Sequence, residues 1–213
     1  MMMKTKKYDL IENYLDELIK EPKCELNYFN DYSLLIAIML SAQTKDSRVN
    51  EVTSILFDKY RSLEDLSNAN FRDLQEIIKP LGSFNKKAFN VHEIARILIN
   101  NYDGKVPTNR DELEQLPGVG RKTANVFLAE FLGLPAIAVD THVERVSKRL
   151  KLVKEDATPL IIENTLMKHI EKDNWAKRHL QLVLFGRYHC KAKNPECSEC
   201  KLKEICSFNK KRK

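Results

Sequence analysis

The sequence lacks long apolar runs and alternating apolar patterns, and these absences exclude several classes of protein. No stretch approaches the roughly 18 consecutive apolar residues that a membrane-spanning helix needs. The N-terminal segment MMMKTKKYDLIENYLDELIK is not a signal peptide, because charged residues interrupt each of its apolar runs. No segment alternates apolar and polar residues as a half-buried strand does, and there is no long repeat or low-complexity linker. We therefore expect a cytoplasmic protein with no targeting signal and no membrane partner.

The sequence does contain the apolar spacing of helices along nearly its whole length. Its 213 residues, 43% of them hydrophobic, allow one large domain or two small ones with a real core. The segment 34–43 is apolar all round, which indicates a helix buried in the centre of a bundle. We predict an all-α fold with short connections. The predicted helices span 8–20, 34–43, 46–60, 71–79, 86–100, 111–116, 122–132, 142–150, 158–171 and 175–188.

The positive charge is concentrated at the C-terminal end. From Arg187 to Lys213, nine lysines and arginines stand against three glutamates, a balance equal to the whole formal charge of +6. A basic patch confined to one end is typical of a protein that binds a polyanion, most often nucleic acid. For the terminal KKRK, a solvated tail is an equally good interpretation.

Four of the five cysteines, Cys190, Cys197, Cys200 and Cys206, lie within 17 residues. In a protein without a secretory signal, clustered cysteines bind metal more often than they form disulfides. Zinc sites usually consist of two close-spaced pairs, and only Cys197 and Cys200 form such a pair. The longer gaps suit a cubane iron–sulfur cluster, so the residues alone leave zinc and iron–sulfur equally open. Cys24 is distant and is interpreted as a lone thiol.

The loop between the first two of these cysteines carries Lys191 and Lys193. A metal centre bound by the cysteines would fix this loop, and the two lysines would then be held in place along one edge of the protein surface. We expect that edge to contact phosphates of a nucleic acid.

The segment LPGVGRKTANV, residues 116–126, contains two glycines between two predicted helices. It is not a phosphate-binding P-loop, because that motif needs Gly directly before the Lys, where this chain has Arg121. We interpret it as a helix–hairpin–helix in which Gly118 and Gly120 adopt backbone angles that other residues avoid. The N–H groups of Gly118 and Gly120 and the positive end of the next helix would bind a DNA phosphate, and Val119 between them is also expected to contact DNA. The alternative is a simple corner between helices with a glycine cap.

Lys122 is the candidate nucleophile. It lies in the first turn of its predicted helix, where the helix dipole disfavours a cation, so its position indicates a use other than stability. Burial and the dipole would both favour the neutral amine, which can attack carbon. Such an amine forms a Schiff base with a sugar aldehyde carbon, which is the chemistry of a lyase.

Asp140 is the candidate carboxylate that this chemistry needs. Asp140 or Thr141 begins the next predicted helix, and the Thr141-x-x-Glu144 spacing fits a capping box. Taken alone, Asp140 is better interpreted as a neighbour of the helix cap than as a catalytic group. His142 is interpreted as structural, because no further metal ligands accompany it.

Together, LPGVGRKTANV, VDTHVERV and the C-x6-C-x2-C-x5-C tail resemble the endonuclease III family, within the helix–hairpin–helix superfamily of DNA glycosylases. The similarity continues through 25–46, 104–107 and 186–190, so it covers nearly the whole chain. Each motif alone is moderately specific, but the three in this order and at these spacings are highly specific.

The resemblance implies two domains with double-stranded DNA in the groove between them. One is a six-helix domain, 23–134, that contains the helix–hairpin–helix at about 111–130. The other is a helical domain built from 1–22 and 135–213, whose loop 190–206 holds a [4Fe–4S] cluster on the four cysteines. The resemblance thus favours iron–sulfur over zinc.

The resemblance also implies a bifunctional DNA glycosylase and abasic-site lyase of base excision repair, acting on oxidised pyrimidines. The damaged base is flipped out of the duplex at a cost of about a few kcal/mol. Lys122 would attack the sugar C1′, displace the base and form a Schiff base, and β-elimination would nick the strand 3′ to the lesion. Asp140 would stabilise the developing positive charge and assist proton transfer. We expect a monomer that works on the nucleoid.

The sequence departs from this family at one DNA-contacting position. Family members fill the gap left by the flipped base with a glutamine and a bulky aliphatic side chain. Gln43 matches the first, but Ser83 stands where Leu or Ile is expected, and serine cannot wedge a base stack in that way. Either Phe84 replaces the wedge, or opening relies on Gln43 and on a weakened duplex. We expect slower flipping or weaker discrimination against undamaged duplex.

Other functions stay open from the sequence alone. A non-catalytic helix–hairpin–helix protein would bind DNA without forming a covalent complex with an abasic site. A superfamily glycosylase could act on a different lesion, and a zinc-bound structural module would be colourless. The sequence does not rank thymine glycol, oxidised cytosines and abasic sites as substrates.

Overall fold

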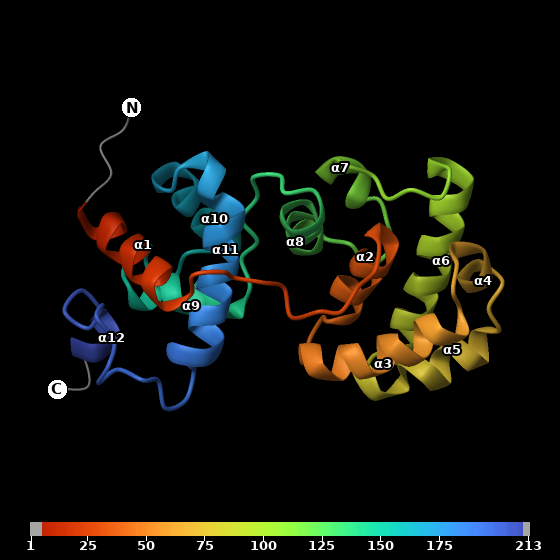
Figure 1. Cartoon of the computed structure of the whole chain (residues 1–213), viewed down its shortest axis with the longest axis horizontal. Coiled ribbons are helices and arrows are strands. Elements are labelled where there is room, and N and C mark those ends of the chain that lie inside the picture. The colour runs from red at the N-terminus through yellow and green to blue at the C-terminus, as the bar shows by residue number, and fades with distance from the viewer. Residues whose placement is uncertain (1–5, 211–213) are drawn as a thin grey trace. The chain divides into compact units, whose positions relative to one another are not determined.

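The structure is a computed structural model that describes residues 6–210 (Figure 1). Within this range the regular secondary structure is entirely helical, as the sequence predicted. No helix among these residues is both long enough and apolar enough to span a membrane. Apart from Lys210, the terminal KKRK lies outside the described residues.

The first of two compact units, Cys24–Leu132, is built around helix α2. Helices α3, α6 and α8 pack against α2 (Figure 1), and nine of the ten residues of α2 are buried. The prediction of a central apolar helix is therefore confirmed. A capping box starts α2: Asn30 Oδ1 accepts a bond from Ser33 N (2.9 Å), and Ser33 Oγ accepts one from Asn30 N (3.0 Å). The helices of this unit are α2 (Asp31–Leu40), α3 (Asp46–Lys59), α4 (Leu63–Ser67), α5 (Phe71–Ile78), the 3-10 turn η1 (Lys79–Leu81), α6 (Phe84–Tyr102), α7 (Arg110–Leu113) and α8 (Arg121–Phe131).

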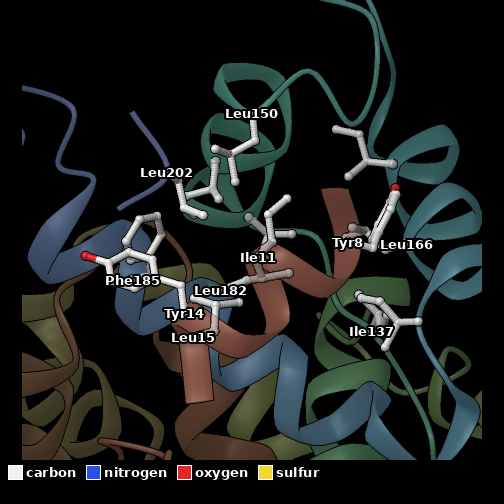
Figure 2. Packing of buried hydrophobic residues seen from close by; sticks show 14 of the residues in the cluster. Tyr8, Ile11, Tyr14, Leu15, Ile137, Leu150, Leu166, Leu182, Phe185 and Leu202 are labelled. Atoms are coloured by element: carbon white, nitrogen blue, oxygen red, sulfur yellow. The ribbon is translucent and has the colours of Figure 1, made fainter. Parts of the chain in front are cut away.

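The second compact unit contains both ends of the chain, up to Lys23 and from Gly133 onward. The expected domain boundaries were after residues 22 and 134. In the core of this unit, Ile11 and Leu15 of α1 lie beside Leu182 of α11 (Figure 2). The helices of this unit are α1 (Lys6–Leu18), α9 (Thr141–Arg149), α10 (Pro159–His169), the 3-10 turn η2 (Lys172–Asn174), α11 (Trp175–Leu184), the π-helix η3 (Phe185–His189) and α12 (Ser207–Lys210).

A polar network joins α1 to α11 in this second unit. The Arg178 guanidinium donates to Asp16 Oδ1 (2.6 Å) and Oδ2 (2.7 Å), and also to Glu12 Oε2 (3.3 Å). Hydrogen bonds from Arg178 hold the pKa of the Asp16 carboxyl well below its usual range, although burial acts in the opposite direction. The N-terminal helix is thereby fixed to the C-terminal half of the unit by charge as well as by apolar packing.

The predicted helix 175–188 is wrong in one respect, because α11 ends at Leu184 and a π-helix follows. In this segment Cys190 N donates to Phe185 O (2.7 Å). Gly186 lies within this π-helix and packs closely against α9, because a Cβ on Gly186 would lie 2.7 Å from His142 Cβ. The short helix α4 was also not predicted, because five residues carry too little periodicity to detect.

Candidate functional site

The two glycines of the hairpin differ in backbone conformation and in packing. Gly118 has φ +79°, and a Cβ there would lie 2.2 Å from Asn90 Nδ2 and 3.2 Å from Met39 Cγ. Both its backbone angle and its packing against α6 and α2 therefore require glycine. Gly120 has φ −99°, which any residue can adopt, and a Cβ there would meet nothing within 4 Å. The prediction of a special backbone angle is thus correct for Gly118 and wrong for Gly120.

Helix α8 begins without a side-chain cap. Its N-cap residue is Gly120, which has no side chain to accept bonds from the first N–H groups of the helix. Those groups have no acceptor inside the helix, and the positive end of the dipole favours an anion beside them. Val119 is buried and its N–H donates to Leu116 O (3.1 Å), so the N–H of Val119 is used within the hairpin, and the DNA contact at Val119 stays a prediction. The uncapped end of α8 remains the candidate phosphate site of the hairpin.

Lys122 is the second residue of α8 and its side chain is exposed. The burial expected from the sequence is therefore wrong. Among the described residues of its own unit, no carboxylate forms an ion pair with Lys122 Nζ. The amine is accessible to a substrate.

Asp140 is itself the N-cap of α9. Its Oδ1 accepts bonds from His142 N (2.9 Å) and Val143 N (2.8 Å), and its side chain is half-buried. The predicted capping box of Thr141 and Glu144 is wrong, because Thr141 is the first helical residue and Glu144 instead accepts from Lys148 Nζ (2.6 Å). Both cap bonds go to Oδ1, so within the described part of this unit Oδ2 accepts no hydrogen bond. The cap fixes the orientation of the Asp140 carboxylate through one of its two oxygens.

His142 has a structural role, as predicted. Its Nδ1 lies 3.0 Å from Nη2 of Arg145, and that same Nη2 donates to Gly186 O (2.6 Å). Arg145 Nε also donates to Cys190 O (3.1 Å). The first turn of α9 is thus fixed to the π-helix and to the start of the cysteine loop.

Gln43 and Ser83 lie at exposed positions on two loops of the first unit. Both have left-handed backbone angles, with φ +57° at Gln43 and +46° at Ser83, which is uncommon for residues other than glycine. Ser83 directly precedes α6, and Phe84 is the half-buried first residue of that helix. Sequence reasoning selected these residues but did not predict their strained conformation.

A residue that sequence reasoning missed connects these two loops. Lys87, in the first turns of α6, is only 6% exposed. Its Nζ donates to Ala42 O (2.9 Å), Thr44 Oγ1 (3.0 Å) and Leu81 O (2.9 Å). Burial lowers the pKa of Lys87. The sequence indicates the burial of Lys87 only weakly. Lys87 shares a helical face with apolar residues, where a surface lysine is not expected.

The four clustered cysteines line one hollow in the second unit, together with Leu150 and Phe208. None of the four is in a disulfide. Burial is the main cause that raises the pKa of the Cys190 and Cys200 thiols. Among residues 6–210, no three His, Cys, Asp or Glu side chains converge as the ligands of one metal ion would. Four thiols that line one hollow have the composition of the ligand set of a [4Fe–4S] cluster, in which each iron takes one thiolate.

The loop that carries Lys191 and Lys193 is held partly by Arg149. Arg149 Nη1 donates to Cys190 Sγ (3.3 Å) and to Lys191 O (2.8 Å), and Nη2 donates to Ala192 O (3.2 Å). Lys191 Nζ donates to Glu196 Oε1 (2.8 Å), whereas Lys193 is exposed. Of the two predicted phosphate contacts, Lys191 is therefore already paired within the loop. Cys24 is half-buried and belongs to the other unit.

Comparison with known proteins places this arrangement in a family. Residues 36–172 match the family described as "HhH-GPD superfamily base excision DNA repair protein". Endonuclease III of Bacillus subtilis is 44% identical over 211 residues, which cover 99% of this chain and 96% of that protein. Endonuclease III of Thermotoga maritima is 40% identical over 203 residues, which cover 95% of each chain.

Solved structures give the same result. A trapped endonuclease III–DNA covalent intermediate superposes with a TM-score of 0.93 and is 45% identical, covering 100% of this chain and 99% of that one. A thermostable thymine-DNA glycosylase has the same fold, with a TM-score of 0.80 at 24% identity over 96% of this chain and 97% of that one. This chain belongs to the endonuclease III family of base excision DNA repair proteins.

Proposed function

We propose that this chain is a bifunctional DNA glycosylase and abasic-site lyase that acts as a monomer on oxidised pyrimidines in double-stranded DNA. The observation that carries the proposal is Lys122, an exposed amine in the first turn of a helix whose N-terminus has no side-chain cap. A phosphate bound at that helix end brings its own sugar within reach of the amine. Similarity to a protein trapped as a covalent intermediate with DNA supports the same chemistry.

In the proposed reaction, Lys122 Nζ bonds to the sugar C1′ while the N-glycosidic bond breaks, and the bond's electron pair leaves with the base, which takes up a proton. The amine then loses a proton, the C1′–O4′ bond breaks as the ring oxygen takes up a proton, and the opened sugar becomes a protonated Schiff base. Removal of a C2′ proton then breaks the C3′–O bond, which nicks the strand 3′ to the lesion. Hydrolysis of the Schiff base frees Lys122.

Asp140 is the proposed catalytic carboxylate. Its Oδ1 is engaged by two backbone N–H groups, which orient the side chain without a contribution from the substrate. The other oxygen would stabilise the positive charge that develops on the sugar and would assist proton transfer.

The proposed DNA contacts fall into three groups. The N-terminus of α8, with Gly120 and Arg121, would bind a phosphate of the damaged strand. Gln43 would fill the gap left by the flipped base, with Ser83 and Phe84 on the neighbouring loop. Further phosphates would meet the loop of Lys191 and Lys193, where Lys193 is the more available cation.

Cys190, Cys197, Cys200 and Cys206 would hold a [4Fe–4S] cluster, because their thiols line one hollow and are not in disulfides. When bound, the cluster supplies covalent cross-links that fix the loop. The reaction of Lys122 uses none of its chemistry.

Borohydride trapping on DNA with an abasic site tests the proposal. Reduction of the Schiff base should yield a covalent protein–DNA complex with the wild-type chain and none with Lys122→Gln. Lys105→Gln, which removes an exposed lysine elsewhere in the same unit, is the matched control and should trap as the wild type does. An adduct that survives in Lys122→Gln would overturn the assignment of the nucleophile. A wild-type chain that binds DNA but never traps would support a non-catalytic DNA-binding protein.

A further inference from the structure

We propose that Lys87 is a positioning residue, which holds the two loops that carry Gln43 and Ser83 in the shape needed to open the duplex. The inference rests on the proposed function, because it gives Lys87 a part in base flipping. Lys87 itself does not touch the reacting atoms in this account.

All the hydrogen-bond donors of the Lys87 ammonium are used. A lysine that is 6% exposed would destabilise the fold if its charge were left without partners. The ammonium has three N–H donors, and the structure provides three acceptors, Ala42 O, Thr44 Oγ1 and Leu81 O, all at 2.9 to 3.0 Å. Thr44 Oγ1 also donates to Leu81 O (2.9 Å), so the hydroxyl accepts from Lys87 and links the two loops a second time.

The three acceptors of Lys87 lie close to Gln43 and Ser83 in the sequence. Ala42 and Thr44 are the immediate neighbours of Gln43, and Leu81 is two residues before Ser83. The hydrogen bonds of the Lys87 amine thus fix the backbone beside both Gln43 and Ser83.

The backbone is strained at both Gln43 and Ser83. Gln43 and Ser83 hold left-handed backbone angles, which non-glycine residues keep only where the surroundings enforce them. Ser83 provides no side-chain hydrogen bond as the N-cap of α6, so the helix end does not explain its conformation. The bonds from Lys87 to Ala42 and Leu81 constrain the backbone on both loops.

The position of Lys87 in helix α6 also indicates that it serves the two loops. A cation near the N-terminus of a helix is opposed by the dipole, so Lys87 does not serve the stability of α6 itself. Its three acceptors lie on the two loops outside α6. The residue therefore connects segments that are 45 and six positions away in the sequence.

The test compares a step that needs duplex opening with one that does not. The first is the single-turnover excision rate for thymine glycol paired with adenine, and the second is borohydride trapping on an abasic site in single-stranded DNA. Lys87→Met removes the amine but keeps the length of the side chain, and Thr44→Val removes the linking hydroxyl without changing the charge. Each variant should slow excision from the duplex by about tenfold, the scale of a buried hydrogen-bonding group left unpaired, and should leave trapping on single strands unchanged.

Two matched variants complete the comparison. Lys86→Met removes the exposed lysine next to Lys87 in α6 and should keep the wild-type ratio of the two rates. Thr44→Ser keeps a hydroxyl and should also keep that ratio. Fluorescence of 2-aminopurine placed opposite the lesion reports duplex opening directly and should fall in Lys87→Met and Thr44→Val.

The possible outcomes separate this inference from the proposed function. Equal losses of both rates, or no loss in either variant, would overturn the positioning role. If Lys87→Met does not fold, as judged by circular dichroism, Thr44→Val decides alone: an unchanged ratio refutes the inference. A wild-type chain that traps no abasic DNA would refute the proposed function instead.

Discussion

Replacing Gly118 with alanine should destabilise the first unit through two separate effects. The backbone angle of +79° lies in the left-handed region, where a Cβ costs roughly 1–2 kcal/mol. The new Cβ would also lie 2.2 Å from Asn90 Nδ2, far inside contact distance, and overpacking of this kind costs about 1–3 kcal/mol. The sum is on the order of 2–5 kcal/mol of lost unfolding free energy, which corresponds to roughly 4–20 °C in melting temperature for a chain of this size.

Gly120→Ala is the control that the structure itself provides. Its φ of −99° suits alanine, and its Cβ would meet nothing within 4 Å, so the melting temperature should stay close to the wild-type value. The same Cβ would project at the uncapped start of α8, so the affinity for duplex DNA should fall if a phosphate binds there.

Scanning calorimetry and DNA-binding titrations at one fixed salt concentration measure the two effects separately. Gly118→Ala should melt early, and Gly120→Ala should melt normally but bind DNA more weakly. Equal melting temperatures for the two variants would refute the geometric reasoning about the hairpin. Normal DNA affinity in Gly120→Ala would count against the phosphate site at α8.

Three further outcomes are expected. Ser83→Leu should raise the single-turnover rate on a paired lesion, because an aliphatic side chain wedges a base stack where serine does not; an unchanged rate would contradict the wedge argument. Arg178 holds the pKa of Asp16 low, so the stability that Asp16 contributes is present at neutral pH and is lost as the pH falls below about 4 toward the lowered pKa. Asp16→Asn should therefore lose less melting temperature than the wild type between pH 7 and pH 3, and equal losses would contradict this account. The purified protein should be brown, with absorbance at about 400 nm and bound iron by elemental analysis, whereas a colourless protein with zinc would refute the iron–sulfur cluster.

Features that depend on local periodicity were predictable from the sequence. Helix α2 is an example, because a segment that is apolar on every face can only be buried. The candidate roles of Lys122 and Asp140 came from motifs of a few residues, and the structure adds the accessibility of one and the orientation of the other.

Features that depend on distant partners were not predictable. The acceptors of Lys87 are two backbone carbonyls and a hydroxyl, which leave no trace in the sequence around residue 87. Small changes in chain direction set the backbone angle of Gly120, and they also decide that Asp140 and not Thr141 is the N-cap of α9. Residue type alone does not determine such changes.

Arg149 contacts the cysteine loop near both of its ends. It donates to Cys190 Sγ and to the Lys191 carbonyl at the start, and its guanidinium lies 3.9 Å from the ring centroid of Phe208, just beyond the last cysteine. The backbone carbonyl of Arg149 also accepts a bond from Ser207 Oγ (2.9 Å). Arg149 of α9 therefore joins the start of the cysteine loop to the segment that follows its last cysteine. Joining the two ends of a loop removes conformational entropy from the chain between them, so these contacts restrict the positions of the cysteines that the loop carries.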